Sequence, residues 1–326
     1  MKALLLKDKG LWKEMMIQET EMPAPAKGEI LVEVHAVGLN PVDYKTATGG
    51  NPNWSYPHIL GLDVAGTVVS TGEGVTDWVK GDRVVYHGDL TKSGGFAEFA
   101  VTTAKSVSRI PDAISFEEAA ALPTAGYTAY QALHRKLPIQ HFQTILIHGG
   151  AGGVGGFAVQ LAKHAGLTVF STASSYNHEY VKSLGADFVI DYRNEDFKAK
   201  IMELTNGRGV DAVLDTVSRQ SATDSLDVLA FGGHIAFIAG PPDFTVINPF
   251  TKSPSYHEVA LGAAHQSNDP IALENLAKMG NELLSLVAQK AVSPMLQEII
   301  ALEDIPQALA RLSERHVKGK IVAKVK

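Results

Sequence analysis

The sequence predicts an α/β protein in which a doubly wound parallel sheet is joined to a smaller, β-rich domain. Three observations support this fold class. Strands and helices alternate through residues 144–240, a glycine-rich segment at 148–156 separates the first of these strands from the first helix, and valine-rich runs fill the first 120 or so residues. A chain of 326 residues is also longer than one hydrophobic core usually serves, so we expect two domains.

The N-terminal part is expected to form short strands. Each run is rich in valine or alternates apolar with polar residues, and each is bounded by Gly, Asp or Pro, as strands between tight turns are. These runs are residues 29–39, 63–72, 81–88 and 94–102. Short strands separated by such turns predict a compact, barrel-like β domain.

The pattern changes at residues 115–134, where Ser115 is followed three residues later by Glu118 and then by alanine-rich sequence. That spacing is typical of a capping box at the start of a helix. Strands are then expected at 144–149, 167–174, 188–192, 211–217 and 234–240, and helices at 154–166, 177–186, 221–233, 270–289 and 303–314, before a final strand at 319–325. The apolar stretch 259–264 is interpreted as the outer strand of the parallel sheet.

The composition excludes several classes of function. The net charge is −6 and no Lys/Arg block is present, so we expect no nucleic-acid partner and no anionic-membrane surface. No apolar run approaches the roughly 18 residues of a membrane span. The chain has no cysteine, which excludes disulfides, thiolate catalysis and cysteine-ligated zinc. These features predict a cytoplasmic protein that acts on a small molecule.

The glycine-rich segment contains the pattern G-x-G-x-x-G as Gly150, Gly152 and Gly155, with Gly153 and Val154 at the expected start of the helix. Glycines at these positions allow a tight turn and let the backbone approach a pyrophosphate, which then faces the free N–H groups of the helix. The alternative is a glycine-rich turn that binds nothing.

The residues after the second strand indicate which dinucleotide would bind. An NAD site usually places Asp or Glu there, about 20 residues beyond the glycines, to bind the ribose 2′-hydroxyl. Here Ala173 and Ser174 occupy that place. Ser174, Ser175 and Tyr192, the last with Arg193 beside it, favour the 2′-phosphate of NADPH. A solvated Ser/Tyr loop is the alternative.

With these residues in view, the whole chain resembles the medium-chain dehydrogenase/reductase superfamily, and within it the zinc-independent quinone oxidoreductase (ζ-crystallin-like) branch. The segments that carry the resemblance are 34–45, 60–68, 81–84, 94–99, 119–133, 149–155, 183–187 and 318–322. The resemblance implies a GroES-like, β-barrel-type catalytic domain over residues 1–123 and 268–326, a Rossmann dinucleotide-binding domain over 124–267, and a cofactor cleft between them. It also implies a homodimer built through the sheet edge at 253–265, where His257 and His265 could instead face the substrate.

Zinc-containing relatives bind their catalytic metal at positions that match Asn40, Leu62 and Thr124 here. Leucine cannot ligate a metal and no thiolate is available. Only residues 85–93 stand where a structural-zinc lobe would be inserted. We therefore expect no metal.

Without a metal, hydrogen-bond donors must meet the negative charge that develops on a substrate oxygen during hydride addition. The resemblance points to Asn40 as the orienting group, Lys45 as the proton or hydrogen-bond donor, and Asp43 as the residue that holds Lys45 in place. The alternative is an Asn-Pro turn followed by a solvated Asp/Lys pair. Tyr86 and His87 could also line the cleft, although a core tyrosine and a surface histidine explain them as well.

The resemblance adds further cofactor contacts at Thr124, Thr128, Ile238, Gly240 and Lys320; for Thr124 a helix cap, and for Lys320 a turn before a strand, are the alternatives. The expected function is NADPH-dependent hydride transfer to quinones or α,β-unsaturated carbonyl compounds without a metal. An alcohol/aldehyde dehydrogenase-like reductase and a non-catalytic NADPH-binding protein are the other two possibilities.

Overall fold

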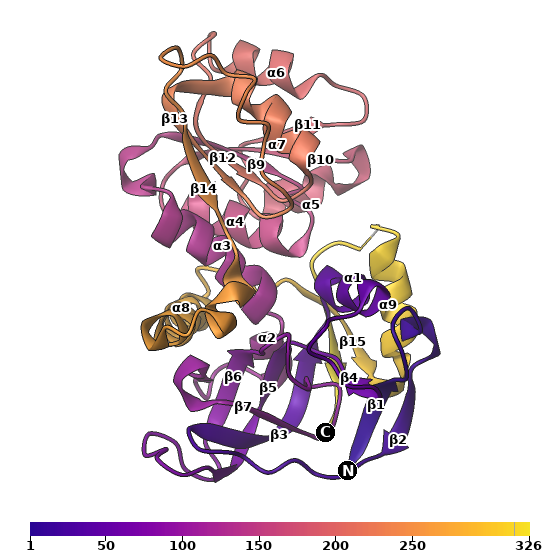
Figure 1. Ribbon diagram of the computed structural model, residues 1–326. Coiled ribbons are helices and arrows are strands. Elements are labelled where there is room, and N and C mark those ends of the chain that lie inside the picture. Colours follow the sequence, from indigo (N-terminus) through magenta and orange to yellow (C-terminus); the bar gives the residue numbers. More distant parts are fainter. Residues whose placement is uncertain (316) are drawn as a thin grey trace. The chain divides into compact units, whose positions relative to one another are not determined.

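A computed structural model describes residues 1–315 and 317–326, which form two compact units (Figure 1). The first unit comprises Met1–Tyr127, Leu261–Lys290 and Pro294–Lys326, and the second comprises Thr128–Ala260 and Ala291–Ser293. The two main boundaries, at 127/128 and 260/261, lie a few residues from the predicted 123/124 and 267/268, and residues 291–293 return briefly to the second unit.

The first unit is built on two mainly antiparallel sheets. The larger has the order β15 (Leu296–Ala301), β16 (Lys320–Lys324), β3 (Glu29–Gly38), β5 (Asp63–Thr71), β6 (Arg83–His87) and β8 (Ser108–Arg109), with β7 (Phe99–Thr103) also paired to β3. The smaller has the order β2 (Met16–Glu19), β1 (Lys2–Leu6) and β4 (His58–Ile59). The predicted β-rich domain is confirmed, and in its central strand Ile30, Val32 and Val34 are buried in the core.

Four α-helices accompany these sheets: α1 (Pro41–Gly49), α2 (Phe116–Ala120), α8 (Pro270–Ala288) and α9 (Ile305–Ser313). The predicted capping box begins α2, with Glu118 N donating to Ser115 Oγ over 3.1 Å and Ser115 N to the Glu118 carboxylate over 2.9 Å. The helical sequence expected after Ser115 is confirmed, but it is not one regular α-helix. After Pro123, which cannot donate a helical hydrogen bond, the chain makes π-helical turns at Pro123–Tyr127 and Ala132–Lys136 around α3 (Thr128–Gln131).

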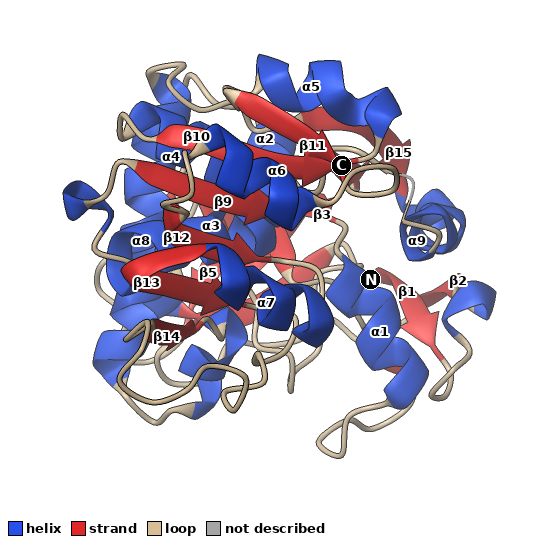
Figure 2. Cartoon of the chain, turned by 90° about the horizontal axis from the view of Figure 1, so that it is seen from above, coloured by secondary structure: helices blue, strands red, loops and turns tan. Residues whose placement is uncertain are grey.

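The second unit contains the parallel sheet. Its strands are β9 (Thr144–His148), β10 (Thr168–Ala173), β11 (Phe188–Asp191), β12 (Val210–Asp215), β13 (Leu229–Phe237) and β14 (Ser255–Glu258). They lie side by side in the order β11-β10-β9-β12-β13-β14 (Figure 2). Helices α4 (Gly153–His164) and α5 (His178–Ser183) cover one face, and α6 (Phe197–Leu204) and α7 (Arg219–Ser225) the other (Figure 1). This is the doubly wound order, in which the strand sequence reverses beside the first strand.

Two element predictions in the second unit are corrected. The helix expected over 221–233 ends at Ser225, because Leu229 already pairs with Val210 as the start of β13. The outer strand is not the apolar stretch 259–264 but the polar segment Ser255–Glu258, which pairs in parallel with β13. Strand β14 is only partly buried, so its sequence need not be apolar.

No helix among the described residues is both long and apolar enough to cross a bilayer.

Candidate functional site

The glycine-rich loop lies between β9 and α4, at the carboxyl edge of the parallel sheet where its strand order reverses. Gly149 has φ 73°, a backbone conformation that favours glycine. A Cβ on Gly150 would collide with the Ser171 side chain, and one on Gly155 with the Gly149 carbonyl group. Two of the three motif glycines are therefore required by the packing of the loop on itself and on β10.

Gly152 differs from these two glycines because its α-carbon faces open space. A Cβ there would meet only the Gly149 oxygen, at 3.4 Å. Gly152 is also the N-cap of the twelve-residue helix α4, and within the described chain no side chain caps it. The first-turn N–H groups near Gly153 and Val154 are thus left for an anion, as at other phosphate-binding helix N-termini. The loop fits the pyrophosphate of a dinucleotide.

The end of β10 carries the two predicted serines. Ser174 is buried, and its Oγ accepts a hydrogen bond from Asn177 Nδ2 over 3.4 Å. Ser175 is exposed and donates to Asp191, which ends the neighbouring strand β11 in register with Ala173. Sequence reasoning missed this carboxylate, although it directly precedes Tyr192.

Asp191 is already satisfied by its own loop. Its carboxylate accepts hydrogen bonds from Asn194 Nδ2 at 2.7 Å and Arg193 N at 3.1 Å. These hydrogen bonds, that from Asn194 first, lower the pKa of Asp191 below its ordinary value. The carboxylate therefore shapes the turn after β11.

Tyr192 and Arg193 are both solvent-facing at this turn. The Tyr192 side chain is 55% exposed. Arg193 Nε lies 3.4 Å from the Tyr192 hydroxyl, and the guanidinium carbon lies 5.8 Å from the centre of its ring. The structure thus gives this end of the sheet an accessible cation beside the two serines.

The remaining predicted cofactor residues of the second unit lie at element ends. Ile238 follows β13 and donates its N–H to Asp215 O over 3.1 Å. Gly240 has φ 134°, where a side chain would be strained. Thr128 is buried at the start of α3.

The first unit holds a buried polar cluster centred on Asp63, the first residue of β5. One carboxylate oxygen, Oδ1, accepts from Thr124 N at 2.8 Å and from Thr124 Oγ1 at 2.5 Å. The other, Oδ2, accepts from Asn40 Nδ2 at 2.8 Å and lies 3.5 Å from Lys320 Nζ. Asp63 was not among the predicted site residues, yet it joins three of them.

Lys320 and Asp43 complete the cluster. Lys320 Nζ donates to Asn40 Oδ1 at 2.5 Å and to Leu39 O at 3.1 Å. Burial lowers the pKa of Lys320, although Asp63 and Asp43 act in the opposite direction. Burial raises the pKa of Asp43 to about 8, so this carboxyl group is largely protonated at neutral pH. Asp63 and Lys320 are the ion pair of the cluster.

This geometry changes the roles predicted for the segment after β3. Asn40 uses both ends of its amide inside the cluster, and it also begins α1 in a reciprocal capping box with Asp43. The expected Asp43–Lys45 hydrogen bond is not formed among the described residues: Asp43 accepts from Asn40 N at 2.8 Å, whereas Lys45 is exposed on α1. Lys320, predicted to touch the cofactor, is committed to Asn40 and Leu39.

The residues that match a zinc site do not suit a zinc ion. Leu62 is a hydrocarbon, the amide of Asn40 is hydrogen-bonded on both sides, and Thr124 donates to Asp63. The Lys320 ammonium at Asn40 Oδ1 would also repel a cation. Elsewhere in the described part of the chain, no three His, Cys, Asp or Glu residues are grouped as metal ligands.

Tyr86 and His87 end β6 close to this cluster, and both are buried. His87 pairs across the sheet with Asp63. Its ring stacks on that of His265, with centroids 5.6 Å apart, and His265 Nε2 lies 3.1 Å from His87 O. Burial lowers the pKa of His87 to about 4, so it is neutral at physiological pH. The alternative of a surface histidine is thus wrong, because His87 is buried.

Segment 50–58, whose conformation no sequence pattern indicated, is tied to a second loop of the same unit. Trp54 Nε1 donates to Leu90 O over 2.7 Å. The Trp54 ring stacks on His58, with centroids 4.2 Å apart and planes 15° from parallel. One indole side chain therefore sets the spacing of the two loops.

Comparison with known proteins agrees with this architecture. Residues 26–112 match the family "Alcohol dehydrogenase GroES-like domain", and residues 153–278 match "Zinc-binding dehydrogenase". The quinone oxidoreductase of Sus scrofa is 33% identical over 247 residues, 74% of each chain. The chloroplast envelope quinone oxidoreductase homolog of Arabidopsis thaliana is 32% identical over 93% of this chain and 92% of its own.

A solved structure extends the similarity to the whole chain. The quinone oxidoreductase of Coxiella burnetii superposes with a TM-score of 0.84 at 31% identity, covering 100% of this chain and 99% of that one. The doubly wound sheet, the GroES-like unit and these relatives together show that the chain belongs to the medium-chain dehydrogenase/reductase superfamily, in its quinone oxidoreductase branch.

Proposed function

We propose that this protein is an NADPH-dependent reductase of quinones or α,β-unsaturated carbonyl compounds that works without a metal ion. The observation that carries the proposal is the open Gly152 at the uncapped start of α4, beside two glycines that packing requires. The names of the relatives support the substrate class.

In this proposal the bound dinucleotide supplies the hydride, and the protein supplies orientation and charge. The N–H groups at the start of α4 hold the pyrophosphate. Ser174, Ser175 and Arg193 hold the 2′-phosphate, because hydroxyl and guanidinium groups donate to it. The nearby Asp191 carboxylate is held in its own loop by Asn194 Nδ2 and Arg193 N.

The Asp63–Lys320 ion pair fixes Asn40 and the start of α1. Among the predicted trio, Lys45 is the exposed donor and is assigned to the negative charge that develops on the substrate oxygen. Asn40 and Asp43 position α1, on which Lys45 is carried. Conjugated substrates suit such a site because they spread that charge over their π system and need less polarisation than a simple ketone.

The test is oxidation of NADPH, and of NADH in parallel, with a benzoquinone, a naphthoquinone, an enone and a simple aldehyde, each with and without a chelator. Turnover of the quinones or the enone that is preferred with NADPH and unaffected by the chelator is expected. Turnover of the aldehyde alone would favour the alcohol dehydrogenase alternative. Tight NADPH binding without any turnover would favour a non-catalytic role.

We also propose a homodimer through the edge of the parallel sheet. Strand β14 is the last in the strand order and pairs only with β13 within the described chain, so its outer edge can pair with that of a second copy. Light scattering should give twice the chain mass of 34.8 kDa.

A further inference from the structure

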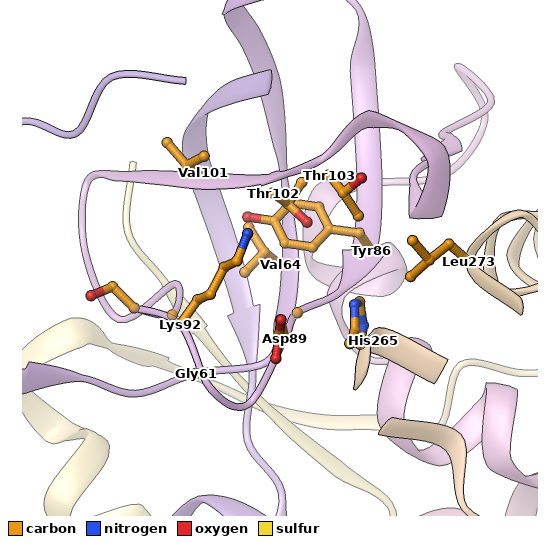
Figure 3. Close-up of a pocket in the computed structure, with 13 residues that line it drawn as sticks. Gly61, Val64, Tyr86, Asp89, Lys92, Val101, Thr102, Thr103, His265 and Leu273 are labelled. Carbon is orange, nitrogen blue, oxygen red and sulfur yellow. The ribbon is translucent and has the colours of Figure 1, made fainter. Parts of the chain in front are cut away.

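A cavity of about 250 Å³ lies within the first unit, against β6, β7 and α8 (Figure 3). All of its lining residues belong to this unit. The side chains of Val64 and Leu273 give it an apolar wall, and Asp89, Ser93 and Thr102 are among its polar residues. Its volume is below the range of roughly 300–1,000 Å³ that is usual for drug-sized ligands, so it suits a compact molecule.

Asp89 is the carboxylate of this lining, and Figure 3 shows it between Lys92 and His265. Its Oδ1 accepts hydrogen bonds from Thr91 N at 2.9 Å and from Gln266 Nε2 at 2.8 Å. Its Oδ2 accepts none among the described residues, yet it is not one of their buried atoms without a partner. One charged oxygen is therefore both unpaired and within reach of a ligand.

The other ionisable groups beside Asp89 do not neutralise it. Lys92 Nζ lies 2.7 Å from a carboxylate oxygen of Glu29, so its charge is already balanced there. Burial lowers the pKa of His265, which keeps the ring neutral at physiological pH. No cation of the described chain forms an ion pair with Asp89. The lining thus carries a net negative charge, and a charge without a counter-ion favours a cationic ligand over a neutral or anionic one.

A second polar atom of the lining also lacks a partner. Thr102, on β7, is 5% exposed, and its hydroxyl makes no hydrogen bond among the described residues. Because that oxygen is not one of the buried atoms without a partner, it reaches open space, and the cavity is the space that Thr102 lines. A hydroxyl oxygen can accept a hydrogen bond as well as donate one. It can therefore add to the carboxylate in binding an ammonium group.

We propose that this cavity binds a compact organic ammonium ion whose N–H groups donate to Asp89 Oδ2. The Thr102 hydroxyl is a further acceptor for this class of ligand, and the small hydrocarbon part packs against Val64 and Leu273. A charge-assisted hydrogen bond is about twice as strong as one between neutral groups. Binding there does not require the dinucleotide, so the inference stands apart from the proposed function.

The probe is cyclopentylamine, which is protonated at pH 7. It is titrated by calorimetry, in phosphate buffer, into the full-length protein without NADPH. Cyclopentanol has the same ring and no charge, and it serves as the neutral control ligand. Saturable binding of the amine is expected, with the alcohol at least tenfold weaker, because the alcohol lacks the charge that pairs with Asp89.

The Asp89→Asn variant tests the carboxylate. Its amide keeps an oxygen that can accept from Thr91 and Gln266, so the loop is preserved while the charge is removed. The variant should bind the amine at least tenfold more weakly and the alcohol as the wild type does. Asp77→Asn, at an exposed aspartate of the same unit outside the lining, is the matched control and should leave the affinity for the amine unchanged.

The two ligands test the proposal on the wild type even if Asp89→Asn fails to fold. Equal affinity for the amine and the alcohol, unchanged affinity in Asp89→Asn, or no saturable binding of the amine would overturn the inference. Displacement of the amine by an equal concentration of ammonium chloride would also overturn it, because the hydrocarbon part would then contribute nothing. NADPH-dependent turnover is measured alongside. Intact turnover without amine binding overturns this inference alone, and amine binding without turnover overturns only the proposed function.

Discussion

The Lys320 ammonium lies 3.5 Å from Asp63 Oδ2, and both side chains are almost completely buried. The pair joins the last strand of the chain to β5, and through Asn40 it also fixes the start of α1. A buried ion pair need not raise stability over an apolar substitute, but removal of one partner leaves the other charge unpaired in a medium of low polarity.

The first prediction concerns this pair. Lys320→Met should lower the free energy of unfolding by about 3–5 kcal/mol, because Asp63 loses its counter-ion. The control is Lys163→Met, which removes a half-exposed pair with Asp187 and should cost about 1 kcal/mol or less. Urea unfolding followed by circular dichroism measures both. Similar costs for the two variants would contradict a special role for the buried pair.

The second prediction concerns pH. Because the pKa of Asp43 rises from 3.8 to about 8 on folding, the folded state keeps a proton that the unfolded state has lost between these values. The contribution of Asp43 to stability is therefore full below the lower value and is lost as the pH rises through the higher one.

The Asp43→Asn variant cannot ionise at this position, so it lacks the pH-dependent contribution of Asp43 to the free energy of unfolding. The difference in unfolding free energy between wild type and variant should therefore fall steadily from pH 5 to pH 8, as measured by urea unfolding in matched buffers. A difference that grows with pH would show that Asp43 is ionised in the folded protein.

The third prediction tests the glycine loop. Gly152→Ala should leave the melting temperature nearly unchanged, because its Cβ meets only the Gly149 oxygen at 3.4 Å. The methyl group would, however, stand where the pyrophosphate approaches, and NADPH should bind about tenfold more weakly or worse. Gly49→Ala, at an exposed glycine with no neighbour within 4 Å, is the control and should bind normally. Fluorescence titration with NADPH measures the affinity of the wild type and of both variants. Equal affinity in the wild type and Gly152→Ala would contradict the placement of the pyrophosphate at this loop.

The fourth prediction concerns cofactor choice. Arg193→Gln should weaken NADPH binding about tenfold and leave NADH binding unchanged, because only the 2′-phosphate needs the exposed guanidinium. Arg208→Gln, at another exposed arginine of the same unit that pairs with Asp211, should alter neither. Ser174→Asp should act in the same direction as Arg193→Gln. Equal losses for NADPH and NADH would place the 2′-phosphate elsewhere.

Local sequence patterns predicted most of the fold. Strands β9, β10, β11 and β12, the helix after the glycine loop and the capping box at Ser115 each depend on residues a few positions apart, and each lies close to where it was expected. Helix α6 was missed although Asp196 caps it, since its Oδ1 accepts from Lys198 N. The outer strand was predicted at the apolar stretch 259–264 because apolar residues are typical of buried strands. The strand that forms the edge of the sheet, Ser255–Glu258, is largely polar.

The buried cluster could not be predicted in the same way. Lys320 and Asn40 are 280 positions apart, and nothing near Lys320 in the sequence indicates its partner. A signal for Asp63 was present: it is the one charged residue of its strand and directly precedes the buried residues Val64 and Ala65. Such a residue must find partners inside the protein, but only the folded chain shows that they are Thr124, Asn40 and Lys320.

The indole of Trp54, which donates to Leu90 O and stacks on His58, restricts how this scaffold can be re-engineered. Consider a chimera that takes residues 50–58 from a homologue but keeps residues 88–93 of this chain. If the imported segment lacks Trp54 or places it differently, the Leu90 carbonyl loses its hydrogen-bond donor. Mutant libraries intended to broaden the range of substrates should therefore exchange residues 50–58 and residues 88–93 together, from the same homologue.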